Sequence, residues 1–172
     1  FRPMAHAVGV RLKEVGKFVE QGWQVMYYAG AFSVGFYFMN KWEFDMRAFF
    51  LEHPAPPCEP LLKTFYLVQL AFWLHMIPVT LVEPWRADFV EMMLHHLITS
   101  GMIASSYTLN FLKIGVAVFA EQDFADIFLP FAKMFKYARK QAIADVMFGI
   151  FALAWIPTRH GLFFIIYYTV GV

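Results

Sequence analysis

Long runs of hydrophobic residues alternate with short polar or proline-rich segments along most of the chain. A helix needs about 20 apolar residues to cross a bilayer, and five of the runs approach that length. The predicted spans cover residues 24–39, 64–82, 88–109, 112–135 and 142–156, and a shorter sixth run covers residues 161–172. This pattern predicts an all-α, polytopic membrane protein, a bundle of about six transmembrane helices whose last helix is truncated.

The connecting segments are predicted from their charges and prolines. Residues 1–22 alternate charged and apolar side chains, which favours an amphipathic helix at the membrane interface. The prolines of residues 40–62 cannot donate helical hydrogen bonds, so this segment is expected to be a loop. Residues 83–86 and 157–160 are expected to end the second and fifth spans. We therefore expect an interfacial segment followed by one transmembrane domain over residues 23–172 that is incomplete at its C-terminal end.

Polar residues gather on one face of the third predicted span, and such residues are rare inside membranes unless they have a function. Positions three and four residues apart share a face of a helix. The face centred on His95 consists of Asp88, Glu91, His95, Thr99, Met102 and Ser106. The fourth span has a similar face, which consists of Asp123, Asp126, Pro130, Lys133 and Tyr137. The two polar faces are expected to lie opposite each other.

His95 and Asp126 are predicted to lie at comparable depth, about 10 Å and about 15 Å from the same side of the membrane. Neutral imidazole can take a proton from an amine or attack an acyl group, and a carboxylate can orient the ring. His95 is therefore a predicted base or nucleophile, oriented by Asp126 or Asp123. We favour the nucleophile, because no Ser or Cys beside it on that face is an obvious alternative. His96 points about 100° away and is better placed as a supporting hydrogen-bond donor.

Composition and charge narrow the class further. Hydrophobic residues make up 60% of the chain and aromatic residues 20%, well above a soluble domain. The net charge of +1 argues against a nucleic-acid partner. The single cysteine, Cys58, excludes an intrachain disulfide and a cysteine-rich metal site. Nine of the fourteen basic residues fall on one predicted side, which makes that side cytosolic by the positive-inside rule.

Several ordered motifs resemble the signature of the ceramide synthases, membrane acyltransferases of the TRAM-LAG-CLN (TLC) domain superfamily. They are residues 94–99 (LHHLIT), 110–115 (NFLKIG), 123–126 (DFAD) and 132–137 (AKMFKY), together with residues 66–73 and 158–161. The resemblance covers nearly the whole chain from about Phe18. The chain departs from the usual pattern at Gln122, Ala125 and Lys113, where the family usually has His, Ser and Arg. Residues 126–130 look like the fungal branch.

The resemblance implies N-acylation of a sphingoid base by a fatty acyl-CoA at the endoplasmic reticulum membrane, within a TLC-type barrel of six helices. Its catalytic residues would be His95, His96, Asp123 and Asp126. Substrate contacts are expected at Thr99 and at four basic residues that could attract coenzyme A phosphates: Lys133, Lys136, Arg139 and Lys140. No metal or cofactor is expected, since acyl-CoA is a co-substrate. The expected partners are acyl-CoA, the sphingoid base and membrane lipids, while a homo-oligomer, a hetero-oligomer and a small accessory subunit all remain open.

Each of these residues also has a structural interpretation. The histidines could form interhelical hydrogen bonds, and the aspartates could pair with Lys113 or Lys133. The four basic residues could serve only to set the topology, and His95 with both aspartates could hold a metal. Two other functions stay open: a non-catalytic TLC-domain lipid-binding or lipid-regulating protein, and a small transporter or proton relay.

Overall fold

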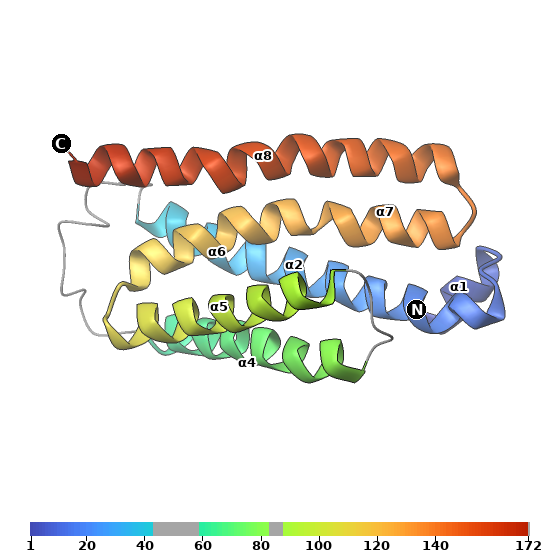
Figure 1. The fold of residues 1–172 in the computed structure, drawn as a ribbon, viewed down its shortest axis with the longest axis horizontal. Helices are drawn as coiled ribbons and strands as arrows, with labels where there is room; N and C mark the ends of the chain where they lie inside the picture. The colour runs from blue at the N-terminus through green and yellow to red at the C-terminus, as the bar shows by residue number, and fades with distance from the viewer. Residues whose placement is uncertain (43–58, 83–87, 172) are drawn as a thin grey trace. The chain divides into compact units, whose positions relative to one another are not determined.

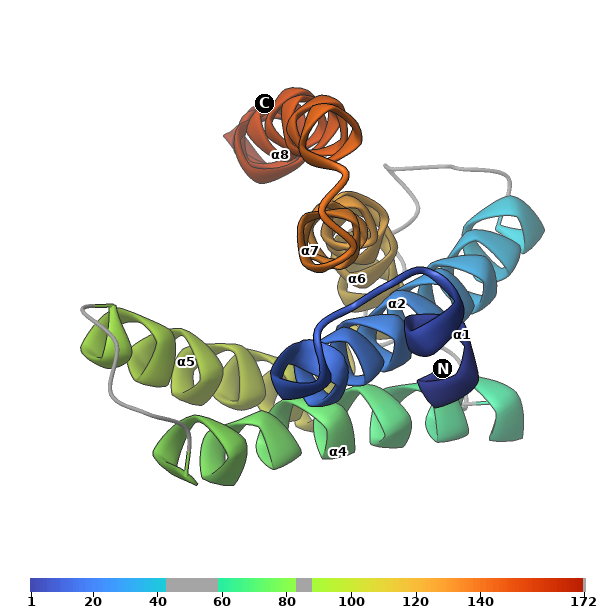
Figure 2. The ribbon, with the colours of Figure 1, turned by 90° about the vertical axis from the view of Figure 1, so that its right-hand side faces the viewer.

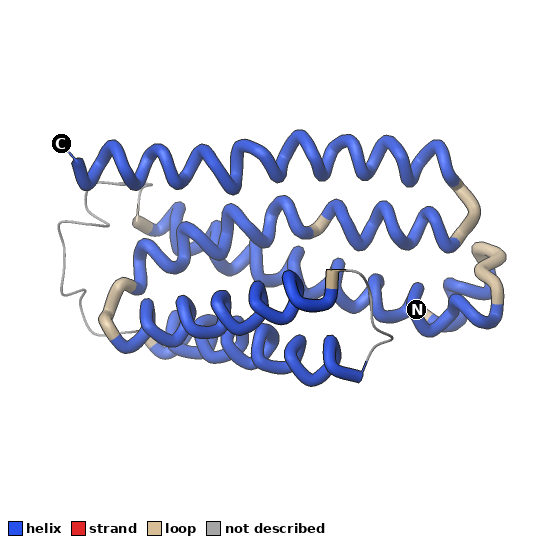
Figure 3. Tube along the Cα trace, viewed as in Figure 1, coloured by secondary structure: helices blue, strands red, loops and turns tan. Residues whose placement is uncertain are grey.

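The computed structural model describes residues 1–42, 59–82 and 88–171, with side chains described as far as Gly161. Every regular element in those ranges is a helix (Figure 3), so the all-α part of the prediction is confirmed. The elements (Figure 1) are α1 (Arg2–Ala7), the 3₁₀ turn η1 (Leu12–Glu14), α2 (Val15–Lys41), α4 (Pro60–Val82), α5 (Phe89–Thr108), α6 (Leu112–Asp126), α7 (Phe128–Tyr137) and α8 (Gln141–Gly171). They form two compact units, one made of Phe1–Glu43 with Ala117–Val172 and the other of Phe44–Val116.

Two of the described helices, α4 and the Gln141–Gly161 part of α8, are long and apolar enough to cross a membrane. Only 28% and 6% of their most apolar windows are buried within the protein, whereas a core helix of a soluble protein would be mostly buried. This exposure favours helices that face lipid. The helix predicted over residues 88–109 is confirmed as α5.

The prediction of a single interfacial helix over residues 1–22 is wrong. The chain forms α1, turns at Gly9, passes through η1 and enters α2 at Val15. Gly9 has a φ of +78°, a left-handed conformation that ends α1 and that glycine adopts without a Cβ penalty.

The fourth predicted span is interrupted. Helix α6 ends at Asp126 and α7 begins at Phe128, with Ile127 between them. Pro130 accounts for the break, because it has no N–H to donate to the carbonyl of Asp126, four residues earlier. Residues 112–137 therefore follow one helical path made of two pieces.

The prediction that residues 157–160 end the fifth span is also wrong, because α8 continues through Pro157. The hydroxyl of Thr158 donates to the carbonyls of Ala154 and Trp155, at 3.0 and 3.1 Å. Pro157 itself leaves the carbonyl of Leu153 without its helical donor, a loss that apolar helices tolerate through local adjustments. The shorter sixth run is thus the second half of α8. The loop expected at residues 40–62 is wrong at both ends: α2 continues to Lys41, and α4 begins at Pro60, where a proline fits the first turn. Residues 43–58 of that loop, like the turn at 83–86, lie outside the described residues.

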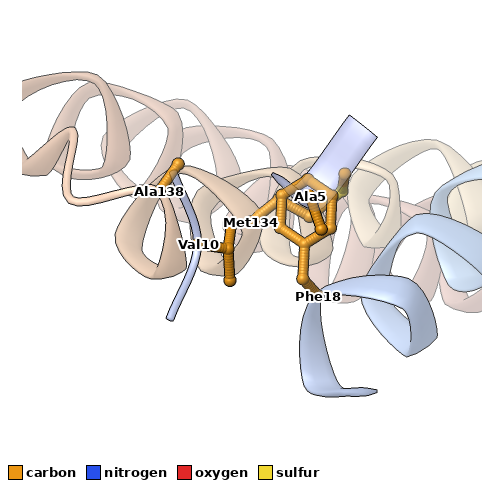
Figure 4. Close-up of a cluster of buried hydrophobic side chains, with 5 residues drawn as sticks. All are labelled: Ala5, Val10, Phe18, Met134 and Ala138. Atoms are coloured by element: carbon orange, nitrogen blue, oxygen red, sulfur yellow. The ribbon is translucent and has the colours of Figure 1, made fainter. Parts of the chain in front are cut away.

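In the first unit, α2 packs against α7, α7 packs against α8, and α1 folds back along α2 (Figure 2). A cluster of buried side chains fixes the N-terminal segment to the end of α7 (Figure 4). Its members are Ala5, Val10, Phe18, Met134 and Ala138. The chain start and the α7–α8 turn therefore lie at the same end of this unit.

In the second unit, α4 and α5 run side by side, and Tyr66 joins α4 to the start of α6. The buried Tyr66 hydroxyl donates to the carbonyl of Leu112 at 2.9 Å and lies 3.0 Å from the Ser106 hydroxyl. A Cβ at Gly115 would overlap that hydroxyl, so a glycine is required there.

Candidate functional site

The two adjacent histidines of α5 both contact one tryptophan of α4. The ring centroid of Trp73 lies 5.4 Å from that of His95, with the rings nearly perpendicular at 80°. It lies 5.8 Å from that of His96, and the two imidazole centroids are 5.7 Å apart. Trp73 is 7% exposed, so its position is fixed by packing. Three aromatic rings from two helices thus form one group.

The two histidines differ in burial. His96 is 2% exposed, whereas His95 is exposed on the surface of the described protein. Neither nitrogen of His96, nor the buried hydroxyl of Ser100 one turn further on, has a hydrogen-bond partner in the described part of the chain. Buried polar groups normally have partners, so His96 and Ser100 retain hydrogen-bonding capacity for another polar group. Thr99 lies beside them and is half-buried.

The aspartates lie on α6 in the first unit. Asp123 is 3% exposed. Asp126 accepts two hydrogen bonds from one guanidinium nitrogen of Arg159 on α8, both at 3.1 Å, and each side chain is 18% exposed. The tyrosines of α2, Tyr27 and Tyr28, lie within electrostatic range of Asp123.

Sequence reasoning missed two members of this group. Arg159 lies in the segment predicted to end the fifth span, although an arginine between apolar runs is itself a signal of a buried partner. Glu121 was not considered, because it falls on a different face of the helix from Asp123. Its Oε2 is buried without a hydrogen-bond partner among the described residues, and Arg159 lies within electrostatic range.

The histidines and the aspartates belong to different units. The predicted contact between His95 and Asp126 therefore stays a prediction. The structural interpretation of the aspartates was an ion pair with Lys113 or Lys133. The ion pair that Asp126 forms in the structure is with Arg159.

Known proteins are similar to this chain over most of its length. The sequence profile described as the TLC domain matches residues 17–172. The chain belongs to the TLC domain family. A sphingosine N-acyltransferase-like protein of Alternaria alternata is 35% identical over 98% of the chain, and sphingosine N-acyltransferase lag1 of Schizosaccharomyces pombe is 39% identical over 95%. Ceramide synthase 5 of Homo sapiens is 32% identical over 86%. The chain spans 39%, 43% and 38% of these relatives, which is less than half of each.

The basic residues of this TLC domain lie at the end of α7. Lys136, Arg139 and Lys140 are exposed, and Lys133 is half-buried one turn earlier. Because the buried cluster fixes the N-terminal segment at the same end, the exposed Arg11 and Lys13 of that segment lie near these cations.

Proposed function

We propose that the protein transfers a fatty acyl group from acyl-CoA to the amine of a sphingoid base and so forms ceramide. The observation that carries the proposal is the paired imidazole group of His95 and His96, held against Trp73, in a chain whose relatives are named sphingosine N-acyltransferases and ceramide synthases. Imidazole is a competent base and nucleophile at neutral pH. No cofactor is required, because the thioester of acyl-CoA is already activated.

In this proposal the protein crosses the endoplasmic reticulum membrane several times, through α2, α4, α5, the α6–α7 path and α8. The apolar exposure of α4 and α8 supports it. The α7–α8 turn faces the cytosol, where acyl-CoA is available and where the excess of basic residues belongs.

The proposed chemistry runs in two steps. A nitrogen of His95 attacks the thioester carbonyl, the carbon–sulfur bond breaks, and the N–H proton of the imidazole passes to coenzyme A, which leaves as the thiol. The neutral amine of the sphingoid base then attacks the acyl-imidazole, the bond between the acyl carbon and His95 breaks, and the proton lost by the amine returns to the imidazole. His96 and Thr99 bind substrate groups beside it on α5.

The test of the function is incubation of the full protein with an acyl-CoA series and sphinganine, with lipid products measured by mass spectrometry. The wild-type protein is expected to form dihydroceramide, and the His95→Asn variant is expected to form it at least a hundredfold more slowly. Lipid binding without product would favour the lipid-regulating alternative. Movement of a solute across proteoliposomes without an acyl donor would favour the transporter.

The order of steps has its own test. Acyl-CoA mixed with the protein in the absence of sphinganine should release about one coenzyme A per active site, and the His95 peptide should carry the acyl mass. Normal turnover with neither burst nor adduct would make His95 a general base instead.

A further inference from the structure

We infer that the N-terminal segment completes the binding site for the coenzyme A phosphates: Arg11 and Lys13 of the η1 region join Arg139 of the α7–α8 turn in one anion site around Glu14. The inference rests on the proposed function for the identity of its ligand. It adds residues more than a hundred positions away from the basic turn, and it assigns a restraining role to an acidic residue.

The first observation is the packing that brings the two segments together. Val10 and Phe18 flank the Arg11–Glu14 stretch, and both are buried against Met134 and Ala138 of α7 (Figure 4). Arg139 directly follows Ala138. The buried cluster therefore fixes the backbone on both sides of the cations, although the cations themselves are exposed.

The second observation is the electrostatic environment of Glu14. Its carboxylate accepts two hydrogen bonds from Arg11, at 2.7 and 2.9 Å. This contact, and the charges of Arg11, Lys13 and Arg139, hold the pKa of Glu14 below its ordinary value. Three cations from two distant segments are thus close enough to act on one carboxylate. With Glu14 ionised, the group has a net charge of about +2, and the exposed Lys136 and Lys140 beside it increase the positive potential.

The third observation is the backbone of Arg139, which has a φ of +59°. The residue occupies the position after α7 where glycine is usual, and the amide of Lys140 donates to the carbonyl of Phe135 at 2.9 Å, as in a glycine-terminated helix. A side chain in this conformation is strained, and strained residues concentrate at functional sites. A cation is retained where glycine would suit the fold better.

Anion binding is the chemistry that this arrangement fits. Phosphates favour clustered guanidinium and ammonium groups on rigid supports. Glu14 competes for the same cations and limits the affinity, so that coenzyme A can leave after transfer.

The test compares variants whose effects have opposite signs. Arg139→Gly removes a cation while relieving the backbone, and Lys13→Gln removes another, so both should raise the KM for acyl-CoA about threefold. Glu14→Gln removes the competing carboxylate and should lower that KM by a similar factor. Arg139→Lys should behave nearly as wild type. Lys63→Gln, at the exposed start of α4, is the matched control and should change nothing.

Three further measurements decide the ligand. The variant effects should disappear with the acyl-pantetheine thioester, which lacks the coenzyme A diphosphate and nucleotide, and should weaken in about 0.5 M salt. They should persist in nanodiscs of purely neutral lipid, because effects confined to anionic lipid would identify a headgroup as the ligand and overturn the inference. The Kd of free coenzyme A should shift in the same directions. Binding of this kind without ceramide formation would refute the proposed function alone, and unchanged KM and Kd in an active enzyme would refute the site alone.

Discussion

Trp73 contacts both imidazoles of α5, at ring distances that fall within cation–π range. Trp73→Leu should therefore release both histidines, with a loss in kcat of roughly 2- to 10-fold, the equivalent of an aromatic pair. Trp73→Phe should recover part of that loss. A second readout is the rate at which diethyl pyrocarbonate modifies the peptide that holds His95 and His96, which should rise in Trp73→Leu.

Trp155→Leu is a suitable control, because Trp155 makes its ring contact with His160 of α8. If Trp73→Leu and Trp155→Leu had the same kcat and the same histidine reactivity, Trp73 would have only a packing role.

The ion pair between Asp126 and Arg159 makes a prediction about stability. Both side chains are mostly shielded from water, so Arg159→Gln leaves a carboxylate without its charged partner. The expected cost is roughly 1–3 kcal/mol in the free energy of unfolding. The double variant Asp126→Asn with Arg159→Gln should cost less than the sum of the two single variants, by about 0.5–3 kcal/mol. Strictly additive unfolding energies would show that the pair contributes nothing.

The histidine pair and the aspartate pair could be predicted from sequence because charged and polar residues stand out inside apolar runs. Their partners could not. Trp73 and Arg159 are joined to the site by contacts between helices, and the spacing within one helix contains no information about its neighbour. Glu121 could not be predicted either, because it lies outside the helix face that contains Asp123 and Asp126.

At the scale of the helices, glycines decide how closely α2 approaches its neighbour. Three residues of α2 are small enough to permit close contact between helices, namely Gly30, Ala31 and Gly35. Not all of them lie where another helix approaches. A Cβ on Gly35 would lie 2.9 Å from the Cβ of Ala120 on α6, whereas a Cβ on Gly30 would meet nothing within 4 Å. Ala31 is 9% exposed and shares the face of Gly35.

Gly35→Ala should therefore destabilise the protein by about 1–3 kcal/mol through overpacking. Gly30→Ala is the matched control, and should be neutral or stabilising by up to about 1 kcal/mol, because alanine favours a helix. Thermal unfolding in detergent measures both. Equal effects of the two substitutions would show that α2 and α6 do not approach at Gly35.

Tyr66 has a comparable role between α4 and the turn that joins α5 to α6. Tyr66→Phe keeps the ring but removes the hydrogen bonds to Leu112 and Ser106, and should cost about 1–2 kcal/mol. Tyr107→Phe is its control: the Tyr107 ring packs 5.7 Å from that of Tyr66, and its hydroxyl makes no hydrogen bond within the described residues. Equal unfolding midpoints for Tyr66→Phe and Tyr107→Phe would show that the Tyr66 hydroxyl does not stabilise the fold.

Helix boundaries followed from sequence where polar residues mark the ends, as at α5, which matches the prediction within one residue at each end. The predicted boundaries are wrong at two prolines. Pro130 interrupts a helix that was predicted to be continuous, and Pro157 lies within a helix that was predicted to end. A proline removes one hydrogen bond in either case, and the surrounding packing and nearby hydroxyls decide whether the helix continues.

At the scale of the whole molecule, the packing of the first unit bears on membrane topology. The buried cluster holds the N-terminal segment against the end of α7, so the two must lie on the same side of the membrane. In the topology proposed above, the chain passes between them through α2, α4, α5 and the α6–α7 path, and four crossings would return it to its starting side. This agrees with the uneven distribution of basic residues, which is independent of the packing.

Single cysteines introduced into a Cys58→Ser background test this topology. Lys13→Cys and Lys140→Cys should react with a membrane-impermeant thiol reagent in sealed microsomes whose cytosolic face is outward, because both positions are exposed and the proposed topology places them on the cytosolic side. Lys63→Cys, at the start of α4 and one crossing away from Lys13, should react only after permeabilisation. Labelling of Lys140→Cys and Lys63→Cys together before permeabilisation would show that α4, α5 or the α6–α7 path does not cross. Protection of Lys13→Cys alone would separate the N-terminal segment from the α7–α8 turn and remove the packing that the coenzyme A site requires.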